Sequence, residues 1–546
     1  MNSTNGEIVL GKLDKMVKEF VYRVTSKKVP EAIAREAGGK IFTFGSYRLG
    51  VHTSGTDIDT LCVVPKTVER EDFFTVMLDM LQKRPEVAEL TAVPDAFTPV
   101  IKMKFSDISI DFTFAKLDLN SVPDSLDLSD DNLLRNLDDR CIRSINGSRV
   151  TDDILRLVPN IPTFRVALRT VKLWAQRRAV YGNIIGFLGG VSWAMLVARV
   201  CQLYPNACAA TIISRFFAIL HQWPWPQPVL LKPIEEGPLQ VRVWNPKLYP
   251  ADKAHRMPII TPAYPSMCST HNVSDSTKAV MLSAFKEASE LVNRIIVEHL
   301  PWQTLFTKDD FFSRYRHYLQ IIASSDTEEK HLKWYGLVES RLRHLVMKLE
   351  RVENLSLAHP YPKGFSRVVP YRTIQEKEDA AHGVIRPPPT MVEGEPDDAI
   401  KTIHTTTFYI GLCIPAREAG STTHRKLDLF RPKEEFVAMV KDWDKFDPQA
   451  MSIVVQHIKS SSLPPELQDE AQEKKTKRSK FGKGKTAGGD ARPPTKKRRG
   501  SIGQNGTMSD AASTASAETP GTPSAFSPPV GNTDSSAANT PVINQA

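Results

Sequence analysis

A glycine-serine pair followed by two alternating carboxylates most constrains what this chain can form. Gly45 and Ser46 precede Asp57 and Asp59 in the run KIFTFGSYRLGVHTSGTDIDTLCVV. Side chains two apart on a strand point to the same side, so both carboxylates can bind the same cations, and apolar residues 61–64 continue the strand into a core. Glycine lets the backbone approach a phosphate, and serine adds a hydroxyl donor. This is the layout that a metal-dependent nucleotidyl-transfer site requires.

A third carboxylate is expected, because two acids are few for two metal ions. Mg²⁺ prefers carboxylate and phosphate oxygens, and two such ions about 3.5 to 4 Å apart stabilise the attacking and leaving oxygens of an in-line displacement. The next predicted strand, IKMKFSDISIDFTFA, alternates apolar and polar residues and places Asp111 on its polar face. We assign Asp111 to the metal that activates a 3′-hydroxyl, and it is a candidate acceptor of the hydroxyl proton.

The alternative for the two first aspartates is structural. Asp-x-Asp is a common pattern, and acidic residues on a half-buried strand usually just face water. For Asp57 and Asp59 alone we favour that alternative. The spacing from Gly45-Ser46, the apolar strand that follows and the later acidic strand together favour the metal site.

The charge of the chain is concentrated in one segment. The 546 residues carry 71 basic and 62 acidic side chains, a formal charge of +9. Residues 474–499 hold 12 of the basic side chains and one acid, and 500–546 hold three acids and no basic side chain. The remaining 473 residues have a net charge of +1, so any RNA groove in the folded part is a local feature.

Cysteine usage and hydropathy indicate a reduced protein that does not enter a membrane. The six cysteines show neither CxxC nor regular spacing, which argues against a disulfide framework and a structural zinc site. The N-terminus is charged throughout and has no signal-peptide core. The most apolar run, 184–198, is shorter than the roughly 20 residues that span a bilayer and reads as a buried helix with its approach loop.

Changes in residue pattern divide the chain into four blocks. Residues 1–159 alternate helix and strand signals, predicting a small α/β domain with the acidic site at a sheet edge. Residues 160–307 are mainly helical. Residues 308–460 predict an α+β module similar to an RNA-recognition fold, but without RNP1-like aromatic residues, so base stacking on its sheet does not follow. Residues 461–546 predict a disordered tail rich in Ser, Thr, Ala, Gly and Pro.

Several elements inside these blocks are predicted individually. Helices are expected around Leu13–Val24 and over 71–84, 336–352 and 433–443, and strands over 405–414 and 451–459. Arg165, Arg169, Lys172 and Gln176 form one polar stripe on a predicted helix. The plain alternative for this stripe is a solvated helix face, and we accept that alternative for Arg165.

The tail carries two basic clusters, KKTKRSK and PPTKKRRG, that resemble a bipartite nuclear import signal. A nonspecific RNA-attracting arm is the competing interpretation, and the two are compatible. Four Ser or Thr residues precede proline and are candidate sites of phosphorylation: Thr519, Thr522, Ser527 and Thr540.

Long runs of the chain strongly resemble the eukaryotic nuclear poly(A) polymerases, most closely the fungal enzymes. They include FGSYRLGVHTSGTDIDTLCVVP, LVPNIPTFRVALRTVKLWAQRRAVYGNIIGFLGGVSWAMLVARVCQLYPNA and HRMPIITPAYPSMCSTHNV, and the resemblance covers roughly residues 10 to 460 in the same order. It implies template-independent addition of AMP from ATP to RNA 3′ ends. It also implies a catalytic domain of the DNA polymerase beta superfamily, a helical central domain and an RRM-like domain, with the active site in the interdomain cleft.

The resemblance also assigns site residues. The family's metal-binding aspartates fall on Asp57, Asp59 and Asp111, and its phosphate turn falls on Gly45 and Ser46, preceded by Phe44 at the nucleotide. The other implied nucleotide contacts are Asn146, Lys172, Tyr181, Asn183, Gly190 and Val191, and the implied primer contacts are Phe97 and Lys102. Family members usually have a further N-terminal segment before the first helix, and their acidic loop usually reads His-Gly-Pro-Gly where this chain has HTSGTDIDT.

Four of these residues have plain structural alternatives. Lys172 alone would be an exposed helix lysine, and Tyr181 a helix-end aromatic residue. Asn146 could cap a helix, since it begins an NGSRVTDD turn, and Phe97 could be a core residue. Only the resemblance favours the nucleotide and primer roles over these alternatives.

The sequence thus predicts a poly(A) polymerase that uses two Mg²⁺ or Mn²⁺ ions. The expected partners are the RNA 3′ end, ATP, subunits of a cleavage and polyadenylation factor, a poly(A)-binding protein and a nuclear import receptor, and we expect a monomeric catalytic subunit in the nucleus. One alternative is a uridylyltransferase or a CCA-adding enzyme. Another is a catalytically silent RNA-binding scaffold, against which the three carboxylates argue.

Overall fold

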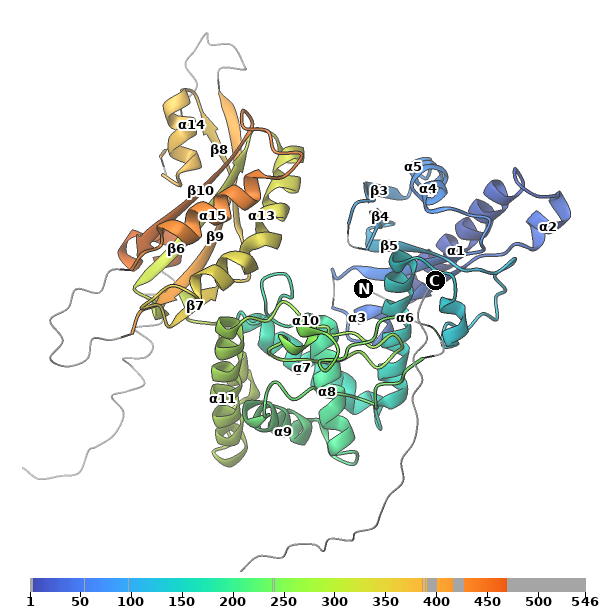
Figure 1. The fold of residues 1–546 in the computed structure, drawn as a ribbon, viewed down its shortest axis with the longest axis horizontal. Helices are drawn as coiled ribbons and strands as arrows, with labels where there is room; N and C mark the ends of the chain where they lie inside the picture. The colour runs from blue at the N-terminus through green and yellow to red at the C-terminus, as the bar shows by residue number, and fades with distance from the viewer. Residues whose placement is uncertain are drawn as a thin grey trace, which may run out of the picture. The chain divides into compact units, whose positions relative to one another are not determined.

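Three groups of helices and strands follow one another in the computed structural model (Figure 1). It describes residues 3–53, 55–96, 98–237, 239, 241–384, 386–387, 389, 400–415 and 427–468. The predicted primer residue Phe97, the basic clusters and the four candidate phosphorylation sites lie outside these residues.

The first group is built on a five-stranded mixed sheet. Its strands lie in the order β1-β2-β5-β4-β3, with β2 and β5 parallel and the other neighbours antiparallel. They are β1 (Lys40–Thr43), β2 (Ile58–Val64), β3 (Val87–Val93), β4 (Val100–Phe105) and β5 (Ile108–Lys116). We had expected the acidic site at an edge of the sheet. Its strands β2 and β5 are instead the second and third of the five, so it does not lie on an edge strand.

The segment predicted as one long acidic strand is a hairpin. Strands β4 and β5 are joined by a turn at Ser106 and Asp107, whose φ angles are 48° and 61°. Two consecutive residues in the left-handed region end a strand, and the alternating pattern continued across the turn and concealed it. The predicted alternation is confirmed over Ile108–Phe112, with Ile110 and Phe112 fully buried, but Thr113, expected on the polar face, is buried as well.

Helices cover this sheet with apolar side chains. Helix α1 (Ser3–Thr25) confirms and extends the predicted helix, and its Leu13, Val17 and Phe20 pack in one cluster with Phe112 of β5. The helix predicted over 71–84 is also present, as α4 (Arg70–Asp72), a π-helical turn over Phe73–Met77 and α5 (Leu78–Gln82).

The second group is helical, as predicted. Its main helices are α6 (Asp139–Leu157), α7 (Ile161–Arg177), α8 (Gly190–Leu203), α9 (Ala209–Gln222) and α11 (Asp275–Val297). Side chains of Asp138, Asn160 and Ser274 accept backbone N–H groups at the starts of α6, α7 and α11. Trp174 of α7 packs edge-on against Trp193 of α8, and their fully buried rings fix how these two helices cross.

The third group is an antiparallel sheet with helices packed on it. Strand order is β10-β6-β9-β7, and β8 also pairs with β9. The strands are β6 (His317–Ser325), β7 (Leu357–Pro360), β8 (Phe365–Tyr371), β9 (Lys401–Cys413) and β10 (Met451–Lys459). Helices α13 (Glu328–Leu349) and α15 (Phe430–Lys441) pack on β6, β9 and β10, while α14 (Ile374–Ala381) packs mainly on β8 and β9 (Figure 1). The two helices and two strands predicted in this block are confirmed, while β6, β7, β8 and α14 were not predicted.

The folded part continues past Ser460. Leu463 and Leu467 are buried in a cluster of aromatic residues that includes Phe312 and Tyr409. The predicted tail therefore begins later than residue 461. The remaining short elements are α2 (Glu31–Glu36), α3 (Gly45–Arg48), α10 (Pro250–Lys253), α12 (Phe311–Arg314) and 3-10 turns over Asp131–Leu134, Trp302–Phe306 and Ser460–Ser462.

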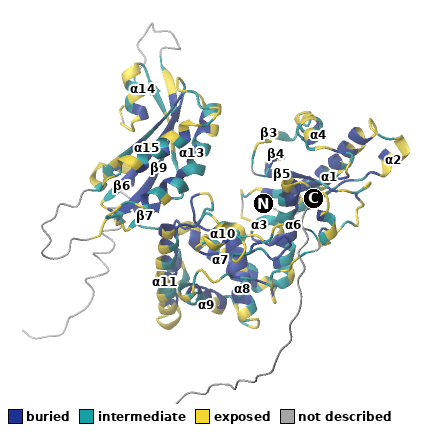
Figure 2. Ribbon diagram, in the orientation of Figure 1, coloured by how far each residue is buried: buried dark blue, intermediate teal, exposed yellow. Residues whose placement is uncertain are grey.

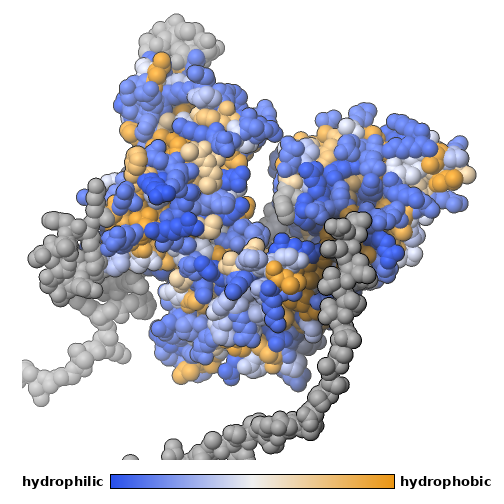
Figure 3. Space-filling model, in the orientation of Figure 1, coloured by the Kyte–Doolittle hydropathy of each residue, from blue (hydrophilic) through white to orange (hydrophobic). Residues whose placement is uncertain are grey.

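Burial follows the predicted pattern (Figure 2). Strand β6 and helix α8 are largely buried, and α8 is the helix expected from the apolar run 184–198. Hydrophilic side chains cover most of the surface seen in Figure 3, and apolar ones are exposed in small groups. Among the described helices none is both long enough and apolar enough to cross a membrane. All six cysteines are free thiols, as predicted.

Candidate active site

Asp59 and Asp111 lie side by side on two neighbouring parallel strands. In the register of β2 and β5, Asp59 pairs directly with Asp111. Asp57 does not lie on the strand, because β2 begins at Ile58, and its side chain is exposed. The predicted set of three carboxylates therefore consists of two aspartates held by the sheet and one on the approach to it.

The carboxylate of Asp59 is in an unfavourable electrostatic environment. Burial, the largest cause, and the negative charges of Asp111 and Asp57 together raise the pKa of Asp59 to about 6. The positive charges of Lys102 and Lys172 act in the opposite direction. Carboxylates gathered in this way are relieved by a cation, which is the chemistry expected of a metal site.

Asp111 is already paired with a lysine. Lys102 lies opposite Asp111 in the register of β4 and β5, and its Nζ is 2.5 Å from Asp111 Oδ2. Across the part of the chain that is described, no three His, Cys, Asp or Glu side chains are arranged as a metal site. The donor chemistry thus fits divalent ions, but Lys102 occupies one of the donors.

The Gly45-Ser46 turn packs directly against Asp59. Gly45 begins the one-turn helix α3 with a φ of 62°, and a Cβ atom there would lie 2.2 Å from Asp59 Oδ2. Only glycine fits both the backbone conformation and this contact. The N–H of Gly45 donates to Thr151 Oγ1 of α6 at 3.2 Å. The turn and the carboxylate predicted from sequence spacing are therefore in contact.

A cavity of about 460 Å³ lies at this turn and gathers most of the predicted nucleotide contacts. The predicted residues that line it are Phe44, Gly45, Ser46, Asp59, Asn146, Lys172, Tyr181, Gly190 and Val191. Burial lowers the pKa of Lys172, partly offset by the charge of Asp59, while burial and Asp59 together raise the pKa of Tyr181. A cation and a neutral phenol therefore share the cavity with the Asp59 carboxylate.

Asn146 offers an unsatisfied acceptor to this cavity. It lies in the middle of α6, so the alternative that it caps a helix is wrong. Its Oδ1 atom is buried and has no hydrogen-bond partner among the described residues. A buried carbonyl oxygen without a partner is costly, and a ligand that donates a hydrogen bond would remove that cost.

Some predicted residues are not part of the cavity lining. They are Asp57, Lys102, Asp111 and Asn183. The carbonyl oxygen of Asn183 accepts from Asn272 Nδ2 at 3.1 Å. The Asn183 side-chain Oδ1 is buried and has no partner in the ranges that the structure describes.

Sequence reasoning missed the apolar wall of the cavity. It is formed by Leu49, Val51, Val150, Ile154 and Leu168, to which Gly147, Thr151 and Thr261 add small or polar groups. An apolar pattern in the sequence predicts core residues. These side chains are indeed buried in the core, and they also border the cavity. Gly147 did carry a signal: a glycine in mid-helix lies against the Phe44 ring, which a Cβ would approach to 2.9 Å.

Arg165 is partly buried and hydrogen-bonded, whereas we had expected it to lie on a fully solvated face. Its Nε donates to the carbonyl of Leu49 at 2.9 Å, and Arg169 donates to the carbonyl of Gly50. The polar stripe of α7 therefore contacts the segment that follows α3.

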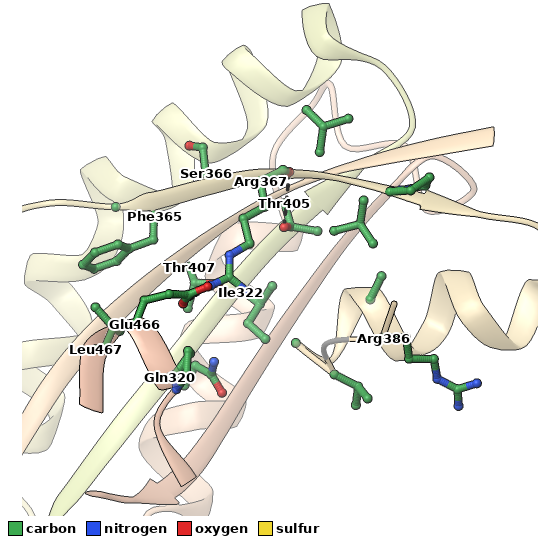
Figure 4. A pocket seen from close by; sticks show the side chains of 18 of the residues that line it. Gln320, Ile322, Phe365, Ser366, Arg367, Arg386, Thr405, Thr407, Glu466 and Leu467 are labelled. Atoms are coloured by element: carbon green, nitrogen blue, oxygen red, sulfur yellow. Dashed lines mark hydrogen bonds and ion pairs between the residues drawn. The ribbon is translucent and has the colours of Figure 1, made fainter. Parts of the chain in front are cut away.

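A larger cavity, of about 800 Å³, lies on the third group of elements (Figure 4). It is bordered by β8, by Gln320 of β6 and by Thr405 and Thr407 of β9, and the Arg367–Glu466 ion pair of 2.6 Å spans it. It contains none of the predicted catalytic residues. Size therefore does not identify the active site, and the carboxylates and the phosphate turn do.

A phosphate turn packed on paired aspartates of a mixed sheet defines a nucleotidyltransferase. Three family models match the chain: the poly(A) polymerase nucleotidyltransferase domain over residues 2–158, the central domain over 163–308 and the predicted RNA binding domain over 310–477. The chain belongs to the poly(A) polymerase family, and it is a poly(A) polymerase with three domains, as predicted.

Curated relatives support this membership over most of their length. Poly(A) polymerase pla1 of Schizosaccharomyces pombe is 50% identical over 492 residues, covering 85% of this chain and 87% of its own. Poly(A) polymerase PAPa of Candida albicans is 50% identical over 473 residues, covering 84% and 85%. A solved structure of Cid1, described by its RNA terminal uridylyl transferase activity, matches with a TM-score of 0.38 at 16% identity, covering 56% of this chain and 92% of that one.

Proposed function

We propose that this chain transfers AMP from ATP to RNA 3′ ends at the cavity beside Asp59 and Asp111. The observation that carries the proposal is the contact of the Gly45 turn with Asp59, which itself pairs in register with Asp111. The proposed phosphate-binding turn and the Asp59 carboxylate therefore lie next to each other in the lining of the cavity. In the reaction, the 3′-oxygen attacks the α-phosphorus of ATP, and the bond to pyrophosphate breaks as the new ester forms.

Asp111 takes the proton of the attacking hydroxyl. Its carboxylate accepts a hydrogen bond from the Lys102 ammonium, and a carboxylate oxygen placed beside the hydroxyl is a suitable acceptor of its proton. Lys102 is exposed and, being cationic, suits a contact with the primer phosphates. We assign Phe97 to the primer on the family resemblance alone.

Asp57, Asp59 and Asp111 would hold the divalent ions. Nucleotidyltransferase domains of this kind generally use such ions, and we propose two Mg²⁺ or Mn²⁺ ions here. When bound, they supply positive charge to the phosphate oxygens. The raised pKa of Asp59 supports this assignment, because burial and the charges of Asp111 and Asp57 that raise it both disfavour an uncompensated carboxylate, and a cation would compensate that charge.

The triphosphate is bound opposite the carboxylates. Lys172 supplies a compact charge, Tyr181 a neutral hydroxyl donor, and Ser46 a second hydroxyl. Gly190 begins α8, so its backbone N–H is not used within the helix and can donate to an anion. A Cβ at Gly190 would lie 3.0 Å from the Tyr181 hydroxyl, so the glycine also makes room for that donor.

The nucleoside occupies the apolar part of the cavity. Asn146, which lines the cavity, and Asn183, which does not, each carry a buried amide oxygen that has no hydrogen-bond partner within the described part of the chain. Both oxygens suit the hydroxyl or amino groups of a nucleoside. Val191 and Phe44 line the cavity with the apolar wall of α6 and α7 and give the base a surface of defined shape. Selection of adenine then depends on shape and a few hydrogen bonds.

The domain limits that we propose are 1–159 and 160–307 for the first two domains, and 308 to at least Leu467 for the third, later than the expected limit of 460, followed by the tail. The three family models, with their limits near 158 and 308, support the first two boundaries. We further propose that the basic clusters of the tail bind a nuclear import receptor and that the enzyme is a nuclear monomer. The near-neutral folded part predicts a weak grip on RNA, so long tails require a cleavage factor subunit or a poly(A)-binding protein.

An assay with separate nucleotides tests the proposed reaction. The purified full chain is incubated with a short oligo(A) primer, a divalent cation and one nucleoside triphosphate at a time. We expect extension with ATP and far slower extension with the other three. Equal rates with UTP or CTP would refute adenylyl specificity, and long tails made by the enzyme alone at physiological salt would refute the need for a partner.

A further inference from the structure

Two arginines of α7 donate hydrogen bonds to the residues that directly follow α3, the short helix that contains Ser46. Arg165 Nε donates to the carbonyl of Leu49 at 2.9 Å, and the Arg169 guanidinium donates to the carbonyl of Gly50. These carbonyls come at the end of α3, where a helix leaves its last oxygens without intrahelical partners. Hydrogen bonds from charged donors are the strongest partners that such oxygens can find.

The contact at Gly50 is so close that a side chain there would have to displace the Arg165 guanidinium. Gly50 has a φ of 72°, and a Cβ there would lie 2.6 Å from Arg165 Nε and 2.7 Å from Arg165 Cζ. The guanidinium is therefore packed on the backbone of the turn. This contact constrains the position of the turn relative to Arg165 in addition to placing a positive charge beside it.

The turn depends on outside support because it is short. Helix α3 has four residues. The backbone N–H groups of Leu49, Gly50 and Val51 donate hydrogen bonds to its carbonyl oxygens. Helix α6 holds its other side, where Asp152 accepts from Arg48 at 2.8 Å. Isolated helical turns of this length are unstable, so the contacts from α6 and α7 determine where the turn lies.

The same face of α7 also carries Lys172, the lysine that lines the cavity. Arg165, Arg169 and Lys172 are spaced i, i+4 and i+7, which places them along one side of the helix. Lys172 and Ser46 both line the cavity. One rigid helix therefore sets the position of the cavity lysine and of the turn that faces it.

We propose that Arg165 and Arg169 are positioning residues for adenylyl transfer. They keep the Ser46 turn at a fixed place relative to Lys172, so that both contact the same triphosphate. This inference rests on the proposed role of Ser46 at the phosphates. Neither arginine lines the cavity, so each acts through the turn and not on the nucleotide.

Hydrogen exchange of the turn provides the first test. Arg165→Ala and Arg169→Ala are compared with Arg177→Ala, which removes an exposed arginine from the same helix. We expect the amides of 45–51 to exchange at least ten-fold faster in the first two variants and unchanged in the control. Arg165→Lys keeps a charged donor and should restore part of the protection. Unchanged exchange in both alanine variants would overturn the proposal.

Steady-state kinetics provide the second test. Each alanine variant should lower kcat with ATP about ten-fold or more, with a smaller change in KM, because a displaced turn affects the reacting geometry. In a Ser46→Ala background the same changes should have little further effect, since they act through Ser46. Fully additive losses would overturn the proposal. If Ser46→Ala alone has no effect, the proposed phosphate role fails, and the exchange experiment still decides whether the arginines hold the turn.

Discussion

Asp59 of β2 faces Asp111 of β5 in direct parallel register. Residues far apart in the chain thus present two carboxylates at neighbouring points of one sheet. The resulting repulsion, together with burial, raises the pKa of Asp59 to about 6, which no pattern in the sequence indicates. The fold holds these charges together at a cost in stability, as expected where a polymerase must later bind cations and phosphates.

Removal of the Asp111 charge should abolish elongation without unfolding the protein. Asp111→Asn keeps the shape of the side chain but cannot accept the hydroxyl proton, and we expect kcat to fall about 10²- to 10⁴-fold. The melting temperature should move little, since the repulsion with Asp59 is lost along with the Lys102 pair. Primer extension and thermal unfolding measure the two quantities.

The matched control is Asp107→Asn. Asp107 is an exposed carboxylate in the turn before β5, and its φ of 61° is one that asparagine adopts readily. We expect normal elongation. If Asp111→Asn extended primers as fast as Asp107→Asn, Asp111 would not be catalytic.

A methyl group at Gly45 should disable the site sterically. In Gly45→Ala the new Cβ would lie 2.2 Å from Asp59 Oδ2, so the carboxylate or the turn must move. Displacement by about 1 Å in an active site costs on the order of 10²-fold in rate, and we expect a loss of that size in kcat.

Gly55→Ala separates this contact from backbone strain. Gly55 has a φ of 84°, but no atom lies within 4 Å of the position of its Cβ. Both variants cost about 1 to 2 kcal/mol of conformational strain, and only Gly45→Ala displaces Asp59. Equal losses of activity in the two variants would show that strain, and not the contact, is responsible.

Removal of the Lys102 amine should ease metal binding. Lys102→Met leaves Asp111 without its ammonium partner, and a partly exposed pair of this kind is worth up to about 1 kcal/mol. The Mg²⁺ concentration that gives half-maximal rate should therefore fall up to about five-fold, measured with saturating primer and ATP.

Lys104→Met is the control for this change. Lys104 lies on the same strand and pairs with Glu89 at 2.6 Å, away from the carboxylates of the site. Its Mg²⁺ requirement should be unchanged. An increased Mg²⁺ requirement in Lys102→Met would contradict competition between the lysine and the metal.

Mild acid should destabilise the third domain through His331. This histidine is 6% exposed, its Nε2 lies 2.7 Å from Thr406 Oγ1, and burial and His404 lower its pKa to about 4. Above pH 6.5 both folded and unfolded forms are neutral. As the pH falls from 6.5 towards 4, only the unfolded chain binds the proton, so stability falls by at most about 3 kcal/mol.

Thermal unfolding of the full chain between pH 7.5 and 4.5 tests this effect. His331→Gln should unfold with a weaker dependence on pH, because glutamine does not titrate. His299→Asn, at an exposed histidine with a φ of 55°, should keep the dependence of the unmodified protein. Parallel curves for the unmodified protein and His331→Gln would refute the assignment.

Hydrophobic patterns within short stretches of sequence predicted the helices and strands that form wherever such a stretch is apolar and long enough. The apolar run 184–198 predicted α8, whose buried Trp193 and Leu196 need only an apolar stretch of helical length. Strand β5 was predicted from Ile108 onward, but the turn at Ser106 and Asp107 was missed. Its residues continue the alternation, and their positive φ angles are set by pairing between β4 and β5, a contact that appears only on folding.

The chemistry of the site was predicted more fully than its packing. The sequence by itself indicated the three aspartates and the glycine-serine turn, because each residue type has the chemical property that its proposed role requires. Lys172 and Tyr181 were assigned only through the family resemblance. Tertiary structure alone decided that Gly45 touches Asp59, that Lys102 pairs with Asp111 and that Arg165 donates to the carbonyl of Leu49. These contacts join segments distant in the chain, and their geometry follows from strand register and helix packing.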